Sequence, residues 1–316
     1  MKTLPELVIG KLQPKYPIIQ GGMAVRLSTA DLAAAVANAG GIGLIAATGM
    51  DEQELREEIR KARSLTDGII GINIMFAYSH FELIVKVAID EGIDLIVQGA
   101  GFSRDIFKWC KESNTEFVPI VASAKLAKTS EKLGAAAVVV EGKEAGGHLG
   151  TDREMYELLE EIADAVTIPV IAAGGIMTAS DMQKAFEKGA KGVQLGTIFA
   201  ATKEAAGADA LKEVYIKATK EDIVLIDSPV GLKGQAIRNE FTEKIARGEA
   251  TPTACDKCLK KCSMNFCILQ ALNNAQQGNL KEGLIFSGEN IEYITEILPA
   301  KEVVNRLVSD FEKINN

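Results

Sequence analysis

Short apolar runs rich in β-branched residues alternate with amphipathic stretches along the first two thirds of the chain. Runs of this kind are typical of buried parallel strands, and the stretches between them are long enough to form connecting helices. The predicted strands are Pro17–Met23, Ile42–Ala47, Ile70–Met75, Leu95–Gly99, Phe117–Ser123, Ala136–Glu141, Pro169–Gly174 and Gly192–Phe199. The predicted helices include Asp51–Ser64, Phe81–Glu91, Lys125–Leu133, Asp152–Ala165 and Ala179–Lys188. Eight strand-and-helix units predict an α/β fold, a closed (β/α)₈ TIM barrel.

The alternative is an open, doubly wound sheet, which shares this alternation of strands and helices. Such sheets commonly carry a glycine-rich dinucleotide turn after the first strand. Here the first strand ends in Gln20-Gly21-Gly22-Met23, which lacks the G-x-G-x-x-G spacing. The glycines that could meet a phosphate follow the seventh and eighth strands instead, where (β/α)₈ barrels commonly bind one. The pattern therefore favours the barrel.

The alternation stops after Phe199, which predicts two regions: a barrel over residues 1–202 and a helical, cysteine-containing appendage over 203–316. Residues 203–250 have a mainly helical pattern that is interrupted by DSPVGLKGQAIRN. The proline and glycines of this insert predict a loop, which either covers the active site or only connects two helices. After Leu298-Pro299, apolar residues recur at helical spacing, so we expect a last helix that packs back on the barrel.

Charge and hydropathy exclude some classes of partner. The formal net charge is −8, and no Lys/Arg stripe interleaved with aromatic residues appears, so we expect no nucleic acid as a partner. No apolar run reaches the length of a membrane span, and the start MKTLPELVIGKLQPKYP lacks the apolar region of a secretion signal. We therefore expect a cytoplasmic protein that does not bind membranes.

Three strand-then-glycine segments, EGKEAGGHLG, PVIAAGGI and GVQLGTIFA, predict the functional site. In the last two, glycine stands where a helix should begin, so free backbone N–H groups and a helix N-terminus can meet an anionic phosphate. The first segment places His148 between glycines beside this phosphate site. A group that titrates near neutral pH could act there on a bound cofactor, or it could only cap a helix.

Four cysteines fall within thirteen residues, at Cys255, Cys258, Cys262 and Cys267. Disulfides are disfavoured in a chain without an export signal, so we expect a metal centre, either zinc or an iron–sulfur cluster. Their spacing matches no common zinc finger or ferredoxin pattern, and reduced structural thiols or redox-active thiols stay open. Cys110 stands alone beside Trp109 and should fill the core.

From Tyr16 to Asn239 the chain resembles the FMN-dependent (β/α)₈ oxidoreductases that include nitronate monooxygenases, formerly 2-nitropropane dioxygenases, and enoyl-acyl carrier protein reductase II. The motifs that carry this resemblance are YPIIQGGMA, IGINIM, VQGAG, VASAKLAK, EGKEAGGHLG, IPVIAAGGI, GVQLGTIF and SPVGLKGQAIRN. Eight motifs in the same order make the resemblance specific. It implies bound FMN and a small-molecule substrate, and barrels with a helical appendage of this kind commonly form homodimers.

The resemblance also implies roles for individual residues. His148 would be the catalytic acid or base, and Gly22 and Met23 would meet the flavin ring through their backbone. Asn73, Gln98 and Lys125 would bond the pyrimidine edge or ribityl chain, where a donor or cation stabilises reduced flavin. Glu141 and Gly147 would shape the ribityl and phosphate side. The phosphate itself would be held by Gly174, Gly175, Gly196 and Thr197.

The shared flavin site serves several reactions, and the fold does not decide between them. We expect a nitronate monooxygenase, which oxidises alkyl nitronates with FMN and oxygen. The alternative is an NAD(P)H-dependent flavin reductase that acts on an enoyl thioester or a quinone. PIIQGGMA has Gly-Gly where many nitronate enzymes have Ala-Pro, and EAGGHLG is close to the reductase motif. A third alternative is a flavin or metal redox sensor that uses the cysteine cluster.

Overall fold

The computed structural model describes residues 3–314. Eight parallel strands form one sheet in the order β1-β9-β8-β6-β5-β4-β3-β2. They are β1 (Ile18–Gln20), β2 (Gly43–Ala46), β3 (Ile70–Met75), β4 (Leu95–Gly99), β5 (Glu116–Val121), β6 (Val138–Glu141), β8 (Val170–Ala173) and β9 (Gly192–Leu195). Ile19 bridges Ile42 in parallel, and the Gln20 N–H donates to the Ile42 carbonyl at 2.9 Å. This contact joins β1 to β2, so the barrel predicted from the sequence is confirmed.

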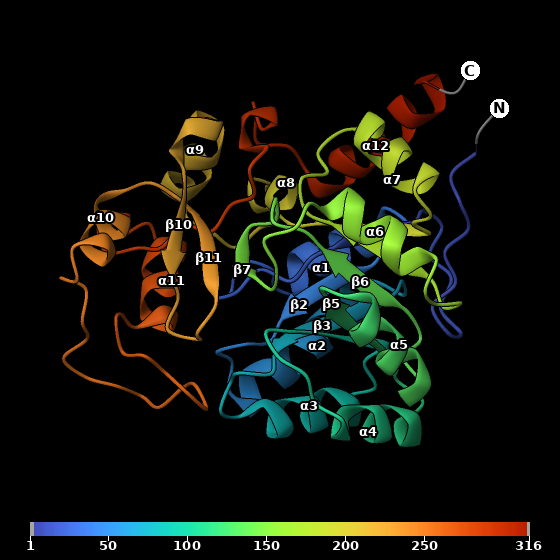
Figure 1. The fold of residues 1–316 in the computed structure, drawn as a ribbon, viewed down its shortest axis with the longest axis horizontal. Coiled ribbons are helices and arrows are strands. Elements are labelled where there is room, and N and C mark those ends of the chain that lie inside the picture. The colour runs from blue at the N-terminus through green and yellow to red at the C-terminus, as the bar shows by residue number, and fades with distance from the viewer. Residues whose placement is uncertain (1–2, 315–316) are drawn as a thin grey trace.

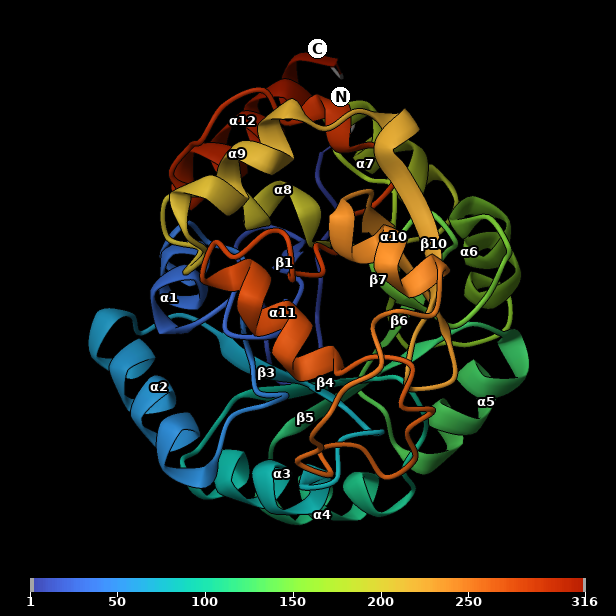
Figure 2. The ribbon, with the colours of Figure 1, turned by 90° about the vertical axis from the view of Figure 1, so that its left-hand side faces the viewer.

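Helices surround the barrel, as Figure 2 shows in a view along its axis. They are α1 (Ala30–Asn38), α2 (Glu52–Leu65), α3 (Phe81–Asp90), α4 (Asp105–Ser113), α5 (Ala124–Leu133), α6 (Met155–Ala163), α7 (Ala179–Glu187) and the short α8 (Thr197–Ala200). The barrel interior is filled by aliphatic side chains such as Ile19, Val97 and Val139. Leu7 and Ile9, from the segment before β1, belong to the same buried cluster, so this segment closes the barrel at the N-terminal ends of its strands.

Residues 209–276 lie at the other end of the barrel (Figure 1). They contain α9 (Asp209–Lys217), β10 (Ile223–Asp227), β11 (Lys233–Ile237), α10 (Glu240–Ala246) and α11 (Ile268–Gln276). The helical prediction for 203–250 is wrong at 223–226, which belong to β10, and the predicted loop of 227–239 contains β11; the two strands form an antiparallel hairpin. β11 also pairs with β7 (Gly147–Leu149), a strand that the sequence did not predict. The appendage is therefore a mixture of helices and a three-stranded sheet.

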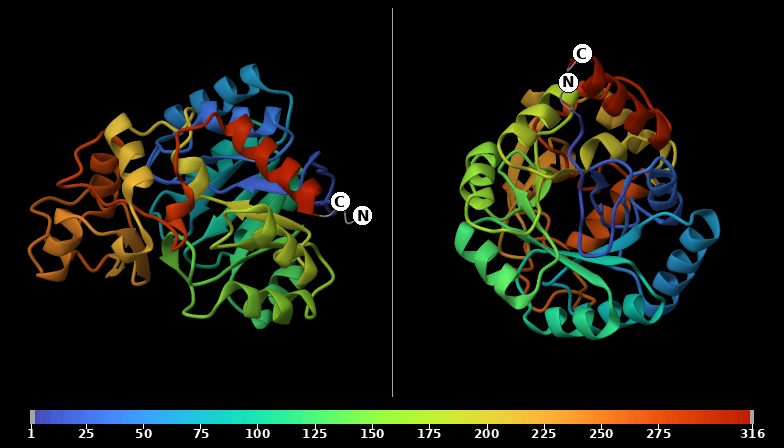
Figure 3. Two further views of the ribbon diagram at one scale, coloured as in Figure 1. Left: turned by 90° about the horizontal axis from the view of Figure 1, so that it is seen from above. Right: turned by 90° about the vertical axis from the view of Figure 1, so that its right-hand side faces the viewer.

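The last helix, α12 (Ala300–Ile314), returns to the barrel, as predicted. It buries Val304, Leu307 and Phe311, and the Phe311 ring meets Phe186 of α7 edge to face at 5.7 Å. Figure 3 shows this helix beside the barrel, with both ends of the chain on the side away from the appendage. α12 therefore covers the barrel wall and leaves the opposite end of the barrel to the appendage.

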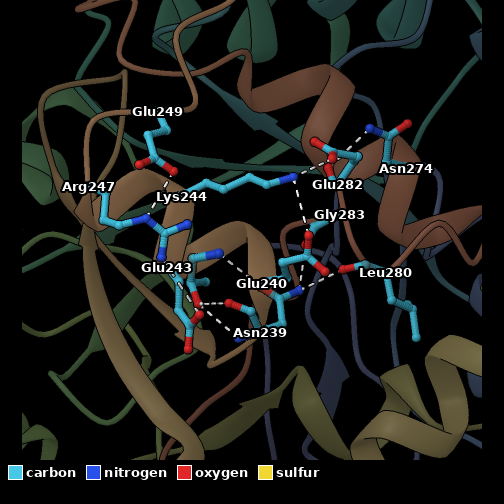
Figure 4. Close-up of polar contacts among 11 residues, drawn as sticks. Asn239, Glu240, Glu243, Lys244, Arg247, Glu249, Asn274, Leu280, Glu282 and Gly283 are labelled. Atoms are coloured by element: carbon cyan, nitrogen blue, oxygen red, sulfur yellow. Dashed lines mark hydrogen bonds and ion pairs between the residues drawn. The ribbon is translucent and has the colours of Figure 1, made fainter.

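Polar contacts join α10 to residues 280–283 (Figure 4). Asn239, the N-cap of α10, donates through Nδ2 to the carbonyls of Leu280 at 3.0 Å and Gly283 at 2.8 Å. Lys244 pairs with Glu282 at 2.6 Å, and the Glu282 carbonyl accepts from Asn274. These contacts determine where the chain enters the cavity described below.

We expect Glu91 to make stability depend on pH. Arg60 and Arg56 of α2 donate to its carboxylate at 2.7 and 2.8 Å, and these hydrogen bonds lower its pKa from 4.5 to about 2. As the pH falls, Glu91 therefore takes up a proton in the unfolded chain before it does so in the folded chain. The stabilisation is present above about pH 4.5 and is lost as the pH falls toward 2. Urea unfolding should show that Glu91→Gln is less stable than wild type, by a difference that shrinks over this range.

Glu112→Gln is the matched control, because Glu112 is exposed and its nearest cation, Lys108, lies 3.9 Å away. The free energy of unfolding of Glu112→Gln should equal that of the wild type at every pH. A stability difference for Glu91→Gln that stays constant down to about pH 2 would contradict the role given to Glu91.

Candidate functional site

A cavity of about 470 Å³ lies at the C-terminal ends of the barrel strands. The loops after the strands line one side of it, and α11 with residues 284–290 lines the other. Figure 2 shows α11 lying across this end of the barrel. Active sites of (β/α)₈ barrels are built at this end, from the loops that follow the strands. We take this cavity as the candidate site.

Glycines shape one end of the cavity. Gly174 and Gly175, directly after β8, have φ of +102° and +71°, a conformation that other residues rarely adopt. Nothing lies within 4 Å of the position that a Cβ would take at Gly196. The Thr197 Oγ1 accepts from the Gly288 N–H at 3.0 Å, and Asn290 Nδ2 donates to the Gly175 carbonyl at 2.6 Å. The 288–290 loop thus holds both glycine turns in place.

Two buried amide oxygens of the barrel strands β4 and β9 have no protein partner among residues 3–314. The Oε1 atoms of Gln98 and Gln194 are buried and accept no hydrogen bond from residues 3–314. A buried carbonyl oxygen without a donor is costly, and such atoms commonly await a ligand. Beside them, Gly22 passes so close to β3 that a Cβ there would lie 2.2 Å from the Asn73 Cβ. Only glycine allows the chain to approach here.

His148 lies on β7 and lines the same cavity. Its Nε2 is 2.7 Å from the Ser228 Oγ, and its ring meets Phe286 edge to face at 5.1 Å. Burial disfavours the charged imidazolium and lowers the pKa of His148 from 6.5 to about 4. The imidazole is therefore neutral near pH 7 and can accept a proton from a ligand that supplies one.

Glu141, at the end of β6, is another titratable group that lines the cavity. Burial raises its pKa from 4.5 to about 8, so its carboxyl carries a proton near pH 7. A protonated carboxyl group is both a donor and an acceptor of hydrogen bonds. Burial thus keeps both Glu141 and His148 uncharged.

The structure brings together most of the residues predicted for the site. Those that line the cavity are Gly22, Met23, Asn73, Glu141, Gly147, His148, Gly174, Gly175, Gly196 and Thr197. Gln98 lies just behind, donating from Nε2 to the carbonyl of the lining residue Gly101 at 2.7 Å. Lys125 is exposed on α5 and is not among the lining residues. His80, at the start of α3, is likewise exposed.

Other residues at the site were not predicted. Gln194 was detectable as the one polar residue in the apolar strand GVQL. Ser228, Phe286 and the 288–290 loop come from segments far along the chain from the barrel motifs, and only the folded structure brings them to His148 and Thr197. Ser228 lies in the motif SPVGLKGQAIRN, whose loop the sequence places over the site as one alternative, but no local pattern signals its contact with His148.

The cysteine segment does not form a metal site in the structure. Within residues 3–314, no group of three or more His, Cys, Asp or Glu side chains is arranged to hold a metal ion. Cys255 and Cys262 are exposed, and each sulfur accepts a backbone N–H from two residues on, at 3.3 and 3.4 Å. Cys258 is partly buried, where its carbonyl accepts from the Ser79 N–H. The segment is thus attached to the loop between β3 and α3.

Comparison with known proteins identifies the family. The family model described as nitronate monooxygenase matches residues 6–82 and 76–310. The chain belongs to the nitronate monooxygenase family. It is therefore an FMN-dependent oxidoreductase, as the family's members are. Among the helices of residues 3–314, none has the length and apolar character that a membrane span needs.

Three similar proteins show the range of this family. A probable nitronate monooxygenase of Staphylococcus aureus strain MSSA476 is 31% identical, over 75% of this chain and 79% of its own. The (3aS,4S,5R,7aS)-5-hydroxy-7a-methyl-1-oxo-octahydro-1H-indene-4-carboxyl-CoA dehydrogenase of Mycobacterium tuberculosis strain H37Rv is 33% identical, over 74% of this chain and 66% of its own. The solved structure of FabK from Thermotoga maritima is 34% identical with a TM-score of 0.88, covering 96% of this chain and 94% of its own.

The residues of this chain fit the FMN that the family uses. Gly196 after β9 leaves open space where a phosphate needs backbone donors, and Gly174 and Gly175 after β8 line the same cavity with positive φ. The Gln194 oxygen without a partner, together with Asn73, lines the cavity and can bond a polar heterocycle there. The close approach of Gly22 to β3 leaves a flat wall without a side chain, on which a ring can lie.

Gly22→Ala should abolish FMN binding. The added methyl group would overlap the Asn73 Cβ, which belongs to a strand and cannot move away, so the wall of the cavity must shift. We expect protein purified with this change to lack flavin absorbance. Gly150→Ala is the matched control in the same cavity, because its nearest neighbour would be the Ala122 Cβ at an ordinary 3.5 Å. Equal flavin content in both variants would show that FMN binding does not require glycine at position 22.

Thiol reactivity tests the predicted metal centre. In metal-free protein, the exposed Cys255 and Cys262 should react at once with Ellman's reagent. Cys110 should react only after unfolding, because burial raises the pKa of its thiol to about 12. Cys255 and Cys262 that are protected in freshly purified protein, and are exposed by a chelator, would support the predicted metal centre instead.

Proposed function

We propose that this chain oxidises small alkyl nitronates with FMN, and that His148 is its catalytic acid or base. The observation that supports this most is the position of His148: an uncharged imidazole lines the same cavity as the glycine cradle of Gly174, Gly175, Gly196 and Thr197. The cofactor and the reacting group of the substrate would thus share one cavity with His148.

Each part of the cavity has a task in this proposal. FMN, when bound, would accept electrons from the nitronate and pass them to dioxygen. The glycine cradle would hold its phosphate, Gly22 and Met23 would lie against its ring, and the amides of Asn73 and Gln98 would orient its polar edge. Leu269, Leu272 and Ile285, from the appendage, line the cavity and exclude water from the reacting atoms.

His148 is suited to an anionic substrate. Its pKa of about 4 applies to the cavity without a ligand. A nitronate beside it would favour the imidazolium, because an opposite charge at close range raises the pKa of a histidine. The imidazole could then hold a proton against a nitro oxygen. Glu141, which carries a proton near pH 7, would not repel the same anion.

A second candidate is the NAD(P)H-dependent reduction of an enoyl thioester. It is favoured by the likeness to FabK, the enoyl-acyl carrier protein reductase II, which spans nearly the whole of both chains. The Mycobacterium tuberculosis relative is also named for a thioester, a carboxyl-CoA. His148 would then give a proton to the α-carbon of the substrate. Four further predictions also remain: a quinone as the acceptor, a homodimer, a cytoplasmic location and a metal at the cysteines.

His148→Gln should lower kcat for nitronate by about 10²- to 10⁴-fold, the usual contribution of a positioned acid or base. FMN content should not change, because the glycine cradle is intact. Oxygen uptake and nitrite release measure the rate, and His80→Gln, at the other histidine, is the matched control. A variant at position 148 with wild-type turnover would exclude His148 from catalysis.

The flavin spectrum under anaerobic conditions separates the two candidates. We expect the flavin absorbance to bleach on addition of an alkyl nitronate and to stay unchanged with NADH or NADPH. Bleaching by a nicotinamide within one turnover, with none by nitronate, would replace the proposal by the reductase.

A further inference from the structure

Among residues 3–314, one ring nitrogen of His148 has a hydrogen-bond partner. Nε2 lies 2.7 Å from the Ser228 Oγ. No hydrogen bond joins Nδ1 to any of residues 3–314, and Nδ1 is not among the fully buried atoms without a partner. Since His148 lines the cavity, Nδ1 is the nitrogen that remains for a ligand.

We propose that Ser228 is a positioning residue for His148. Its hydroxyl oxygen accepts the Nε2–H of the imidazole and so holds the ring in the tautomer whose Nδ1 lone pair is free toward the cavity. A neutral imidazole has one donor and one acceptor nitrogen, and the hydrogen bond at one nitrogen decides which is which. That Nε2 donates and Oγ accepts rests on the proposed function. A neutral imidazole that serves as acid or base must take up a proton, and only Nδ1 faces the cavity for this.

Ser228 is held firmly enough to impose this choice. It begins the turn between β10 and β11, where its N–H donates to the Leu232 carbonyl at 2.9 Å and its carbonyl accepts from the Gly231 N–H at 3.0 Å. Gly231 has a φ of +81°, as this tight turn requires. Ser228 is only 3% exposed, so water does not replace its hydroxyl at the imidazole.

The imidazole is held from its own side as well. His148 stands opposite Gly234 in the pairing of β7 with β11, and Gln235 Nε2 donates to the Ala145 carbonyl at 2.9 Å. A Cβ at Gly234 would lie 3.1 Å from the Phe286 ring, so this glycine makes room for the ring that packs edge to face on His148. Backbone pairing and the aromatic ring together restrict the imidazole.

The cysteine segment fixes the turn on both sides of Ser228. The Ser263 N–H donates to the Pro229 carbonyl at 3.1 Å, and Asn265 Nδ2 donates to the Asp227 carbonyl at 2.5 Å. Both donors lie between Cys262 and Cys267. Asn265 therefore acts on His148 through Ser228, and its removal should loosen the same contact without touching the cavity.

The tautomer can be observed directly, because the chain contains only two histidines. Full-length, FMN-loaded protein labelled with ¹⁵N-histidine gives long-range ¹H–¹⁵N spectra in which protonated and unprotonated ring nitrogens have distinct shifts. His80→Asn assigns the signals. We expect one tautomer for His148, protonated at Nε2, in the wild type, and a mixture of tautomers in Ser228→Ala.

Turnover should follow the tautomer. Ser228→Ala should lower kcat/KM about tenfold, the effect of losing one hydrogen bond. Ser228→Thr keeps the hydroxyl and should keep the tautomer. Ser64→Ala, on the exposed face of α2, is the matched control and should change nothing. If Ser228→Ala fails to fold, Asn265→Ala should show the same mixing of tautomers to a smaller extent.

An Nδ1–H tautomer in the wild type, or an unchanged single tautomer in Ser228→Ala, would overturn the positioning role. The spectra need no substrate, so this failure is distinct from failure of the proposed function. A wild type that leaves nitronates untouched, but loses its Nε2–H tautomer in Ser228→Ala, would overturn the proposed reaction and support the role of Ser228.

Discussion

The closure of the barrel at β1 is the constraint on which the rest of the structure depends. β1 has three residues, and it joins β9 through parallel pairing and β2 through the contact of Ile19 with Ile42. Because all eight strands are parallel, closure brings their C-terminal ends to one rim. Gly22 and Thr197, far apart in the sequence, therefore line one cavity. An open sheet would place these loops along an edge.

Much of this arrangement could be predicted from the sequence, because barrel strands buried on both faces read as apolar runs. All eight predicted strands overlap the observed ones, and the glycines after β8 and β9 lie where a barrel places a phosphate site. β7 escaped prediction because Gly-His-Leu has no strand pattern of its own and becomes a strand only by pairing with β11. The Ser228 contact depends on that pairing and was equally hidden.

Burial has opposite effects on the pKa values of Glu141 and His148, two titratable groups that line the cavity. It raises the pKa of Glu141 to about 8 and lowers that of His148 to about 4, and each loses its charge near pH 7. A bound anion would act differently on them: it would promote protonation of His148, and it would hold Glu141 in its protonated state. The negative charge of a ligand can therefore be balanced by one group, protonated His148. Its other ring nitrogen, Nε2, is already hydrogen-bonded to Ser228.

Two parts of the chain line the cavity, and each supplies residues of a different kind. The phosphate cradle and the polar barrel mouth come from the loops and ends of the barrel strands, whereas Leu269, Leu272 and Phe286 come from the appendage. The barrel can therefore keep one cofactor site while the appendage changes the space left for a substrate. The chain is similar to proteins named for nitronates and for a carboxyl-CoA and to FabK, which is consistent with this division. Substitutions at α11 and the 284–286 segment should accordingly change which substrate is accepted, while FMN stays bound.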